Sequence, residues 1–182
     1  MTAMIQQETQ PDNPVFEQSQ IMSSIARKQC QVSEIIELRK SYLADDLRND
    51  DMMRIDEKLD EMSIHVGYYH DKRLVGAIRF SDPVSDFTYL NRLNFYQYAV
   101  NMPDRFLEVS RFFIVPGYRR YCVNLLFDTC DLMRKETQYG YYLALAQNHY
   151  TKIYRKLGTT VLYSGIKLRN KDSEYCISLG KF

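Results

Sequence analysis

The sequence predicts a mixed α/β domain built on a single central, mostly antiparallel sheet with flanking helices. Its 182 residues suit one domain with a sizeable core. Runs rich in β-branched and aromatic residues alternate with stretches of helical periodicity, and no internal repeat is visible. The strongest strand signal is F-L-E-V-S-R-F-F-I-V at residues 106–115, which ends at Pro116-Gly117 and precedes a long amphipathic pattern. This strand-turn-helix unit is the centre of the predicted fold.

The first half of the chain is expected to begin with a flexible arm, because residues 1–19 are polar and Gln-rich. The folded domain then spans residues 20–182. The predicted elements of this half are a strand at 21–28, a helix capped by Ser33 with apolar Ile35, Leu38 and Tyr42, an acidic helix at 50–62, and a hairpin of strands 64–69 and 73–80. Residues 81–104 predict an inserted helix over a cleft, with Phe87, Leu90 and Leu93 on its apolar side.

The second half predicts helices and strands in alternation after residues 106–115. The expected elements are a long helix with Val123, Leu126, Phe127, Cys130 and Met133 on one face and Gly140 as its stop, a short buried strand at 141–146, a helix at 148–157 ended by Gly158, and strands at 160–168 and 174–179 around a turn at 169–172. The element order is typical of one mixed sheet rather than of two domains.

Charge and composition exclude several functions. Lys and Arg number 24 and Asp and Glu 23, so the net charge of +1 argues against a general nucleic-acid binder. No apolar run is long enough to cross a membrane, and no secretory signal is visible, so we expect a cytoplasmic protein with four reduced cysteines. Three histidines and no C-x-x-C pair predict no metal site, and the absence of a glycine-rich phosphate loop predicts no nucleotide.

Two motifs resemble the GNAT acyltransferase superfamily over most of the domain. They are V-P-G-Y-R-R at residues 115–120, between a strand and a helix, and I-Y-R-K-L-G at residues 153–158. The resemblance implies a splayed central strand with an acyl thioester in the gap beside it. It also implies that the start of the following helix cradles the pyrophosphate of the donor. The family places glycine or alanine in that cradle, whereas Arg119 begins the run R-R-Y-C-V-N here, and side chains at the small positions would crowd coenzyme A.

A narrower resemblance accounts for this departure. The run E-V-S-R-F-F-I-V at residues 108–115, with Arg39 and Arg79 upstream, resembles the E-x-S-R-F-x-x-V strand of acyl-homoserine-lactone synthases and long-chain N-acyl amino acid synthases. Members of that branch draw acyl chains from acyl carrier protein, which has no adenosine pyrophosphate. The lactone synthases also carry a D-x-Y-D-like motif, and the acids at 45–46 and 50–51 lack its tyrosine. The resemblance therefore favours a bacterial N-acyl amino acid synthase, with tyrosine as the expected acceptor.

Amide formation from a thioester needs a base for the amine and an acid for the departing thiolate. Glu108 is the one carboxylate within an apolar strand, and the resemblance favours it as the base; by residue type alone it reads as an ion pair with Arg79 or Arg39. Tyr154 is the candidate acid, and a tyrosine on the core face of a helix is at least as good an account of it. His149 is a weaker candidate that an exposed turn explains equally well.

The expected acceptor site consists of arginines that grip a carboxylate, together with a serine. Its residues are Arg39, Arg79, Arg111 and Ser110, and the alternative is a salt-bridge network that holds the strands together. Regular alternation would put Glu108, Ser110 and Phe112 on one face and Arg111 on the other, and a bulge would bring them closer. Backbone N–H groups around 112–114 are the expected oxyanion donors.

Two further sets complete the expected site. The acyl tunnel is expected to be lined by Phe80, Phe106, Phe112, Phe113 and Leu143, although such a stripe is more often ordinary core. The acidic carrier protein is expected to dock on basic residues around the donor loop, namely Arg119, Arg120, Lys152, Arg155 and Lys156. Residues 41–62 hold the opposing acidic excess. Cys122, although it lies at a helix start, is read as structural.

Together these observations predict an N-acyltransferase that moves a long acyl chain from acyl carrier protein to the α-amine of an amino acid. No cofactor is bound permanently, because the acyl-phosphopantetheine of the carrier protein is the donor, with acyl-CoA as the alternative. Two other functions stay open: a CoA-dependent N-acetyltransferase of a small amine or protein, and a non-catalytic domain that binds an acylated partner. The expected partners are acyl carrier protein and the amino acid, with transient membrane contact through the lipid product.

Overall fold

The computed structural model describes residues 20–42, 50–83, 88–92, 94–95, 102–168 and 172–182. The predicted arm at 1–19, Asp45 and Asp46, Phe87, Leu93 and most of the turn at 169–172 lie outside the described residues. No helix within the described part of the chain is long and apolar enough to cross a membrane.

One seven-stranded sheet forms the middle of the molecule, and this confirms the predicted fold class. The strands are β1 (Met22–Ile25), β2 (Ile64–His70), β3 (Arg73–Ser81), β4 (Phe106–Ile114), β5 (Tyr141–Gln147), β6 (Thr160–Lys167) and β7 (Glu174–Lys181). Their order across the sheet is β1-β2-β3-β4-β5-β7-β6. Every neighbouring pair is antiparallel except β4 and β5, which run parallel because a helix connects them.

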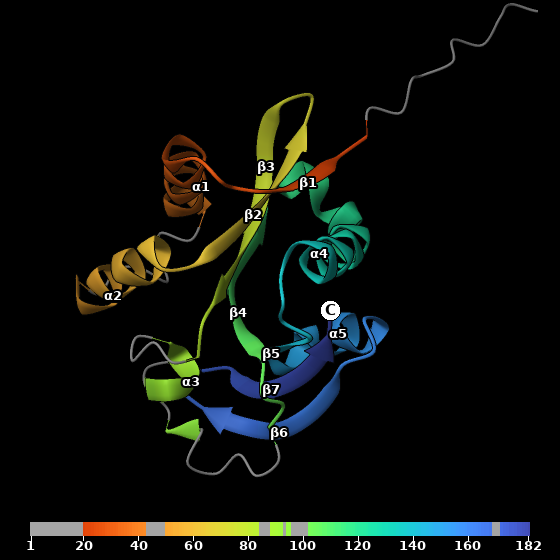
Figure 1. The fold of residues 1–182 in the computed structure, drawn as a ribbon. Coiled ribbons are helices and arrows are strands. Elements are labelled where there is room, and N and C mark those ends of the chain that lie inside the picture. The colour runs from red at the N-terminus through yellow and green to blue at the C-terminus, as the bar shows by residue number, and fades with distance from the viewer. Residues whose placement is uncertain (1–19, 43–49, 84–87, 93, 96–101, 169–171) are drawn as a thin grey trace, which may run out of the picture.

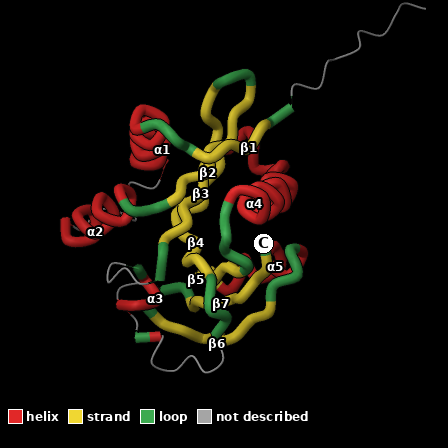
Figure 2. Tube along the Cα trace, viewed as in Figure 1, coloured by secondary structure: helices red, strands yellow, loops and turns green. Residues whose placement is uncertain are grey.

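Helices cover both faces of this sheet (Figure 1). The α-helices are α1 (Gln29–Tyr42), α2 (Asp50–Glu61), α3 (Tyr89–Arg92), α4 (Cys122–Glu136) and α5 (Thr151–Lys156), and 3-10 turns at Pro116–Tyr121 and Asn148–Tyr150 lead into the last two. Figure 2 shows α1, α2 and α3 on one side of the strands and α4 and α5 on the other.

Two predicted helix ends are wrong for local reasons. Helix α1 begins at Gln29 rather than after Ser33, because the Gln31 side-chain oxygen accepts hydrogen bonds from the backbone N–H groups of Arg27 and Lys28. Helix α4 ends at Glu136, where Thr137 turns extended and donates its hydroxyl to the Met133 carbonyl at 2.7 Å. Gly140 belongs instead to the entry of β5. The predicted stop at Gly158 is confirmed, since it follows α5 with φ +76°.

Apolar side chains form three clusters, on the two faces of the sheet. The largest lies between the sheet and α4 and includes Leu107, Val109 and Leu126. A second lies beneath α3 around Leu90, and a third lies beneath α1 around Ile35. Strand β4 contributes to all three clusters, so it is the strand from which side chains reach both faces.

A β-bulge interrupts the regular alternation of β4. Arg79 pairs with Ser110 and Ala77 with Phe113, so that Ile78 stands opposite both Arg111 and Phe112. Arg111 has φ +53°, a left-handed conformation that costs a non-glycine residue about 1 kcal/mol or more. Ser110 and Arg111 consequently both face α2, and Phe112 faces α4. The predicted placement of Phe112 beside Ser110 is therefore wrong, and the expected bulge is present.

Candidate functional site

The parallel strands β4 and β5 separate part-way along their length. Their pairing runs from Phe106 opposite Tyr141 to Val109 opposite Ala144 and ends there. Strand β4 nevertheless continues along β3 to Ile114, and β5 continues along β7 to Gln147. The carboxyl ends of both strands therefore diverge at the same edge, where α4 and α5 begin. This splay is the centre of the candidate site.

Glu108 lies one residue before the splay and is buried, with 2% of its surface exposed. Its carboxylate accepts a hydrogen bond of 3.0 Å from the backbone N–H of Leu90 at the start of α3. The sequence allowed an ion pair between Glu108 and either Arg39 or Arg79. Both arginines instead bind aspartates of α2. A carboxylate with a backbone donor is held in one orientation, as a base in a site must be.

The two buried arginines meet on Asp60 of α2. Arg39 from α1 contacts Asp60 with both terminal nitrogens, one of them at 2.8 Å, and Arg79 Nη1 from β3 lies 2.9 Å from the same carboxylate. Arg39, Asp60 and Arg79 are each 3% exposed or less. Three elements are thus joined by charge-assisted hydrogen bonds in a water-poor interior.

Asp56, one turn earlier on α2, extends this cluster to β4. Its Oδ1 accepts from Arg79 Nη2 at 3.0 Å, and Arg111 Nε lies 2.9 Å from its Oδ2. Arg79 Nε also donates to the Ser110 hydroxyl at 3.0 Å. We call Arg39, Asp56, Asp60, Arg79 and Arg111 the ionic cluster. It holds the bulged segment of β4 against α2.

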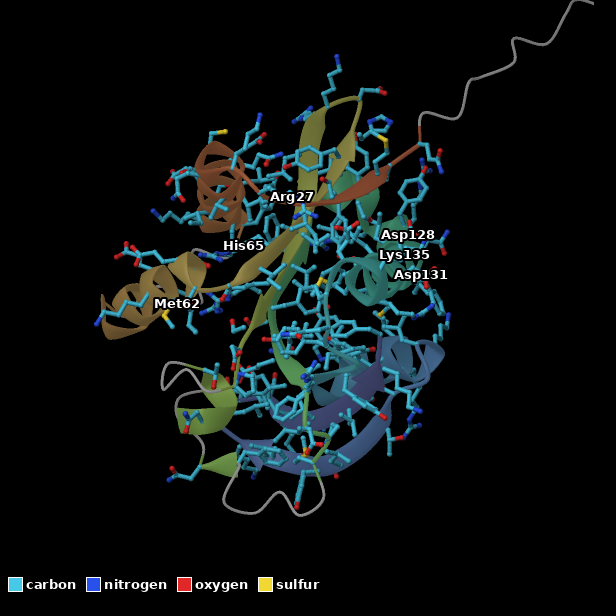
Figure 3. The ribbon with its side chains drawn as sticks, viewed as in Figure 1. Arg27, Met62, His65, Asp128, Asp131 and Lys135 are labelled. Atoms are coloured by element: carbon cyan, nitrogen blue, oxygen red, sulfur yellow. The ribbon has the colours of Figure 1, made fainter. Side chains whose placement is uncertain are left out.

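The surroundings lower the pKa values of both Asp60 and His65, for different reasons. Burial alone would raise the pKa of Asp60, but Arg39 and Arg79 outweigh it, and the pKa lies below its usual value. His65 of β2 is 1% exposed, and its Nε2 lies 3.0 Å from the Asp60 carbonyl. Burial lowers the pKa of His65, so this ring favours the neutral form. Figure 3 shows His65 between α2 and the sheet.

Sequence reasoning missed Asp56 and Asp60, which it counted only as part of an acidic run. Only the acids at 45–46 and 50–51 were compared with the lactone-synthase motif, whereas the two acids that face the sheet are Asp56 and Asp60. A signal was present: Asp56, Leu59 and Asp60 stand at positions i, i+3 and i+4 and share one helix face. All three are buried, and Glu57, Lys58 and Glu61 are exposed.

The four residues expected to hold the acceptor lie together in the structure, but their side chains bind one another and the aspartates of α2. Arg39, Arg79, Ser110 and Arg111 belong to one connected network. The guanidinium groups of Arg39 and Arg79 point at Asp56 and Asp60, which is the salt-bridge arrangement named above as the alternative. Arg111, whose side chain is 9% exposed, lies nearest to solvent among the three arginines.

Tyr154 of α5 lies on the opposite side of β4 from the ionic cluster. Its ring helps to line an apolar pocket between the sheet and helices α4 and α5; the other lining residues are Ile78, Phe80, Val109, Leu126, Thr129, Cys130, Tyr142, Leu157 and Phe182. Burial raises the pKa of Tyr154 to about 12, so its hydroxyl stays protonated near neutral pH. It therefore carries a proton and is a weaker acid than an exposed tyrosine.

The five residues expected to line one acyl tunnel lie in three clusters. Phe80 lines the apolar pocket, and Phe112 packs beside the same cluster edge-on to Tyr68. Phe106 and Leu143 lie beneath α3, and Phe113 lies beneath α1. Tyr142, Leu126 and Phe182 line the pocket, although the sequence did not single them out for it.

The donor loop is helical from Pro116 onward. A 3-10 turn covers Pro116–Tyr121 and passes directly into α4, whose Cys122 N–H is bonded back to the Arg119 carbonyl. One N–H group of the expected cradle, that of Cys122, is therefore engaged by its own turn. The five residues expected to dock the carrier protein are all exposed: Arg119, Arg120, Lys152, Arg155 and Lys156. Burial raises the pKa of the Cys122 thiol, as expected of a structural cysteine.

His149 is exposed in the 3-10 turn before α5, its ring 4.0 Å from that of Tyr150, which matches its simpler interpretation. No group of three or more His, Cys, Asp or Glu side chains with metal-binding geometry occurs among the residues that the structure describes.

No protein-family model matches the chain, and no curated protein does. Solved structures do. FeeM, an N-acyl amino acid synthase from uncultured soil microbes, superposes with a TM-score of 0.64 at 12% identity, covering 89% of this chain and 91% of FeeM. This chain has the GNAT fold. The splay of β4 from β5 is then the GNAT splay that the motifs implied.

Two further structures of this fold are described as enzymes that use coenzyme A or acyl-CoA. BjaI, a CoA-dependent acyl-homoserine lactone synthase in complex with MTA, has a TM-score of 0.64 at 17% identity, covering 83% of this chain and 76% of BjaI. An acyl-CoA N-acyltransferase from Pseudomonas aeruginosa has a TM-score of 0.62 at 13% identity, covering 88% of this chain and 99% of its own. At identities of this size, a shared fold is what the superpositions establish.

Proposed function

We propose that this protein is an N-acyltransferase that moves a long acyl chain from acyl carrier protein to the α-amine of an amino acid. The observation that carries the proposal is the splay after Val109 and Ala144, with buried Glu108 on one side and protonated Tyr154 on the other. In this proposal a thioester is held in that gap, Glu108 is the base for the attacking amine and Tyr154 is the acid for the leaving sulfur.

The reaction balances with these two groups. The amine nitrogen attacks the thioester carbon, a C–N bond forms and the C–S bond breaks. Glu108, directly or through a water, takes the proton that the amine loses, and Tyr154 supplies a proton to the thiolate. Backbone N–H groups of β4 beyond Val109, where β5 no longer pairs, are the proposed donors to the oxyanion.

In this proposal the ionic cluster holds the residues of the acceptor site in fixed positions. Arg39 and Arg79 act through Asp56 and Asp60, which hold Arg111 and the bulge in place. We assign contact with the acceptor carboxylate to Arg111, because a guanidinium matches a carboxylate and its side chain is the least buried of the three. Arg39, Arg79 and Ser110 are positioning residues in this account.

Two features of the donor side favour acyl carrier protein over coenzyme A. Cys122 and Asn124 replace small residues at the start of α4, and the preceding turn already uses Cys122 N–H internally. An adenosine pyrophosphate would find crowded backbone there. The exposed basic residues Arg119, Arg120, Lys152, Arg155 and Lys156 instead suit the acidic surface of a carrier protein.

Coenzyme A remains the second candidate donor, because two proteins of the same fold are described as CoA-dependent or acyl-CoA enzymes. The experiment that separates an enzyme from a non-catalytic acyl-binding domain is a lipid extract of an expressing strain. Mass spectrometry of that extract should show N-acyl amino acids that are absent from a strain with the empty vector. Extracts without any new N-acyl product would contradict the proposal.

A further inference from the structure

The turn that joins β2 to β3 is short, exposed and basic. Strand β2 ends at His70 and β3 begins at Arg73, so that only two residues lie between them. These residues, Asp71 and Lys72, have φ of +48° and +66°. Two left-handed residues in succession are typical of the tight hairpin turn whose twist matches that of the strands. Lys72 and Arg73 are both exposed, so the turn holds two cations in a defined place at the end of the hairpin.

A contact between side chains joins this turn to the donor loop. His70 Nδ1 lies 3.0 Å from the Tyr118 hydroxyl, and the centroids of the two rings are 5.3 Å apart. His70 and Arg73 are directly opposed in the hairpin, so their side chains leave the sheet on the same side. Arg73 therefore lies one strand away from the ring that meets Tyr118. Arg119 and Arg120 follow Tyr118 directly and are exposed as well.

The donor loop has the turn on one side and α5 on the other. Burial raises the pKa of the Cys122 thiol, and the charge of Lys156 on α5 opposes that shift, which places Lys156 near the start of α4. Figure 1 shows the β2–β3 turn and α5 on opposite sides of α4. The basic residues of α5 that we assigned to docking are thus matched by basic residues across the loop.

The cations of the turn and the loop are not neutralised by the fold. Among the residues that the structure describes, no carboxylate forms an ion pair with any of them: Lys72, Arg73, Arg119 and Arg120. Exposed arginines elsewhere do pair, as Arg27 does with Glu136. A row of cations without counter-charges produces a positive field that attracts an acidic partner.

We infer that the β2–β3 turn is a second docking segment for acyl carrier protein, in which Lys72 and Arg73 bind acidic residues of the carrier. The inference rests on the proposed function, which assigned docking to the donor loop and α5 alone. Charge contacts on both sides of the loop fix the orientation of the carrier and not only its position. The contact between His70 and Tyr118 keeps the turn and the loop in register as the carrier binds.

The test measures binding itself and does not depend on turnover. Acyl carrier protein of the expression host, bearing its phosphopantetheine group, is titrated into the full-length protein by calorimetry at low and at high salt. Lys72→Gln with Arg73→Gln should raise the dissociation constant about threefold or more at low salt and less at high salt. The matched control, Arg134→Gln with Lys135→Gln, removes two exposed charges from the last turn of α4 and should change it by less than about twofold.

A turn variant that binds the carrier as tightly as the wild type would overturn the inference and leave the proposed function standing. Equal weakening in the turn variant and the control would also overturn it, because net charge would then explain both. A wild-type protein that does not bind the carrier would contradict the inference together with the proposed donor. Binding that depends on the turn, in a protein that forms no N-acyl amino acid, would support the inference and contradict the proposed reaction.

Discussion

Strand β4 presents charged residues to one face of the sheet and apolar residues to the other. Toward α2, Ser110 and Arg111 join a buried ionic cluster in which each aspartate meets two arginines. Toward α4, Val109 and Phe112 adjoin a pocket bounded by hydrocarbon and aromatic rings. The charged face is rigid because each contact is directional, whereas apolar contacts tolerate rearrangement. We therefore assign recognition of a small polar acceptor to the first face and of a flexible chain to the second.

The largest expected effect concerns Glu108, which stands where the two faces meet. Glu108→Gln keeps an oxygen that can accept the Leu90 N–H but removes the base, so kcat should fall about 10²- to 10⁴-fold. Steady-state kinetics with purified protein measures the loss, and denaturant unfolding checks that the fold is retained. A variant with wild-type kcat would remove Glu108 from the mechanism.

The next largest effect is expected on the free energy of unfolding, when a residue of the ionic cluster is changed. Asp60→Asn leaves Arg39 and Arg79 short of a buried counter-charge, and the free energy of unfolding should fall by about 3–5 kcal/mol. Asp131→Asn is the control, because it breaks an exposed pair with Arg134 on α4 and should cost less than about 1 kcal/mol. Similar losses in both variants would show that the ionic cluster contributes no more than a surface pair.

A smaller effect should appear as the pH falls. The pKa of His65 is lowered in the folded protein, so the unfolded chain binds the proton more readily and the free energy of unfolding declines below about pH 6.5. The lowered pKa of Asp60 adds a second decline at strongly acidic pH, as that carboxylate is protonated.

Urea unfolding across this pH range measures both steps. His65→Gln should remove the decline near pH 6.5 and leave the more acidic one. A wild-type curve that is flat between pH 7 and 5 would contradict a buried, neutral histidine beside Asp60, Arg39 and Arg79.

The smallest expected effect is on docking beside the pocket face. Arg119→Glu with Arg120→Glu should raise KM for acyl carrier protein severalfold and weaken its salt dependence, with kcat little changed. Lys135→Glu, at the far end of α4 (Figure 3), is the matched charge change and should leave KM unaltered. Equal changes in KM for both variants would mean that net charge, rather than this surface, governs docking.

Much of the fold could be predicted because its signals are local. The run at 106–115, the hairpin at Asp71-Lys72 and the stop at Gly158 each depend on neighbouring residues, and all three are confirmed. The start of α1 and the end of α4 were wrong because single side chains, Gln31 and Thr137, decide them. Such details follow from hydrogen-bond geometry rather than from composition.

The site was less accessible to sequence reasoning because it depends on which face each residue occupies. Eight acids between residues 41 and 62 look alike in sequence, yet packing selects Asp56 and Asp60 as the partners of the arginines. The bulge at Arg111 shifts Phe112 to the opposite face, so alternation could not assign the aromatic residues to one lining.

The most direct test of the proposed reaction is a comparison of donors with purified protein and a free amino acid. Matched long acyl chains are supplied on acyl carrier protein and on coenzyme A, with acetyl-CoA as the third donor, and the amide product is measured by mass spectrometry. The expected product is an N-acyl amino acid, with kcat/KM highest for the chain supplied on acyl carrier protein. Turnover of acetyl-CoA alone would contradict it.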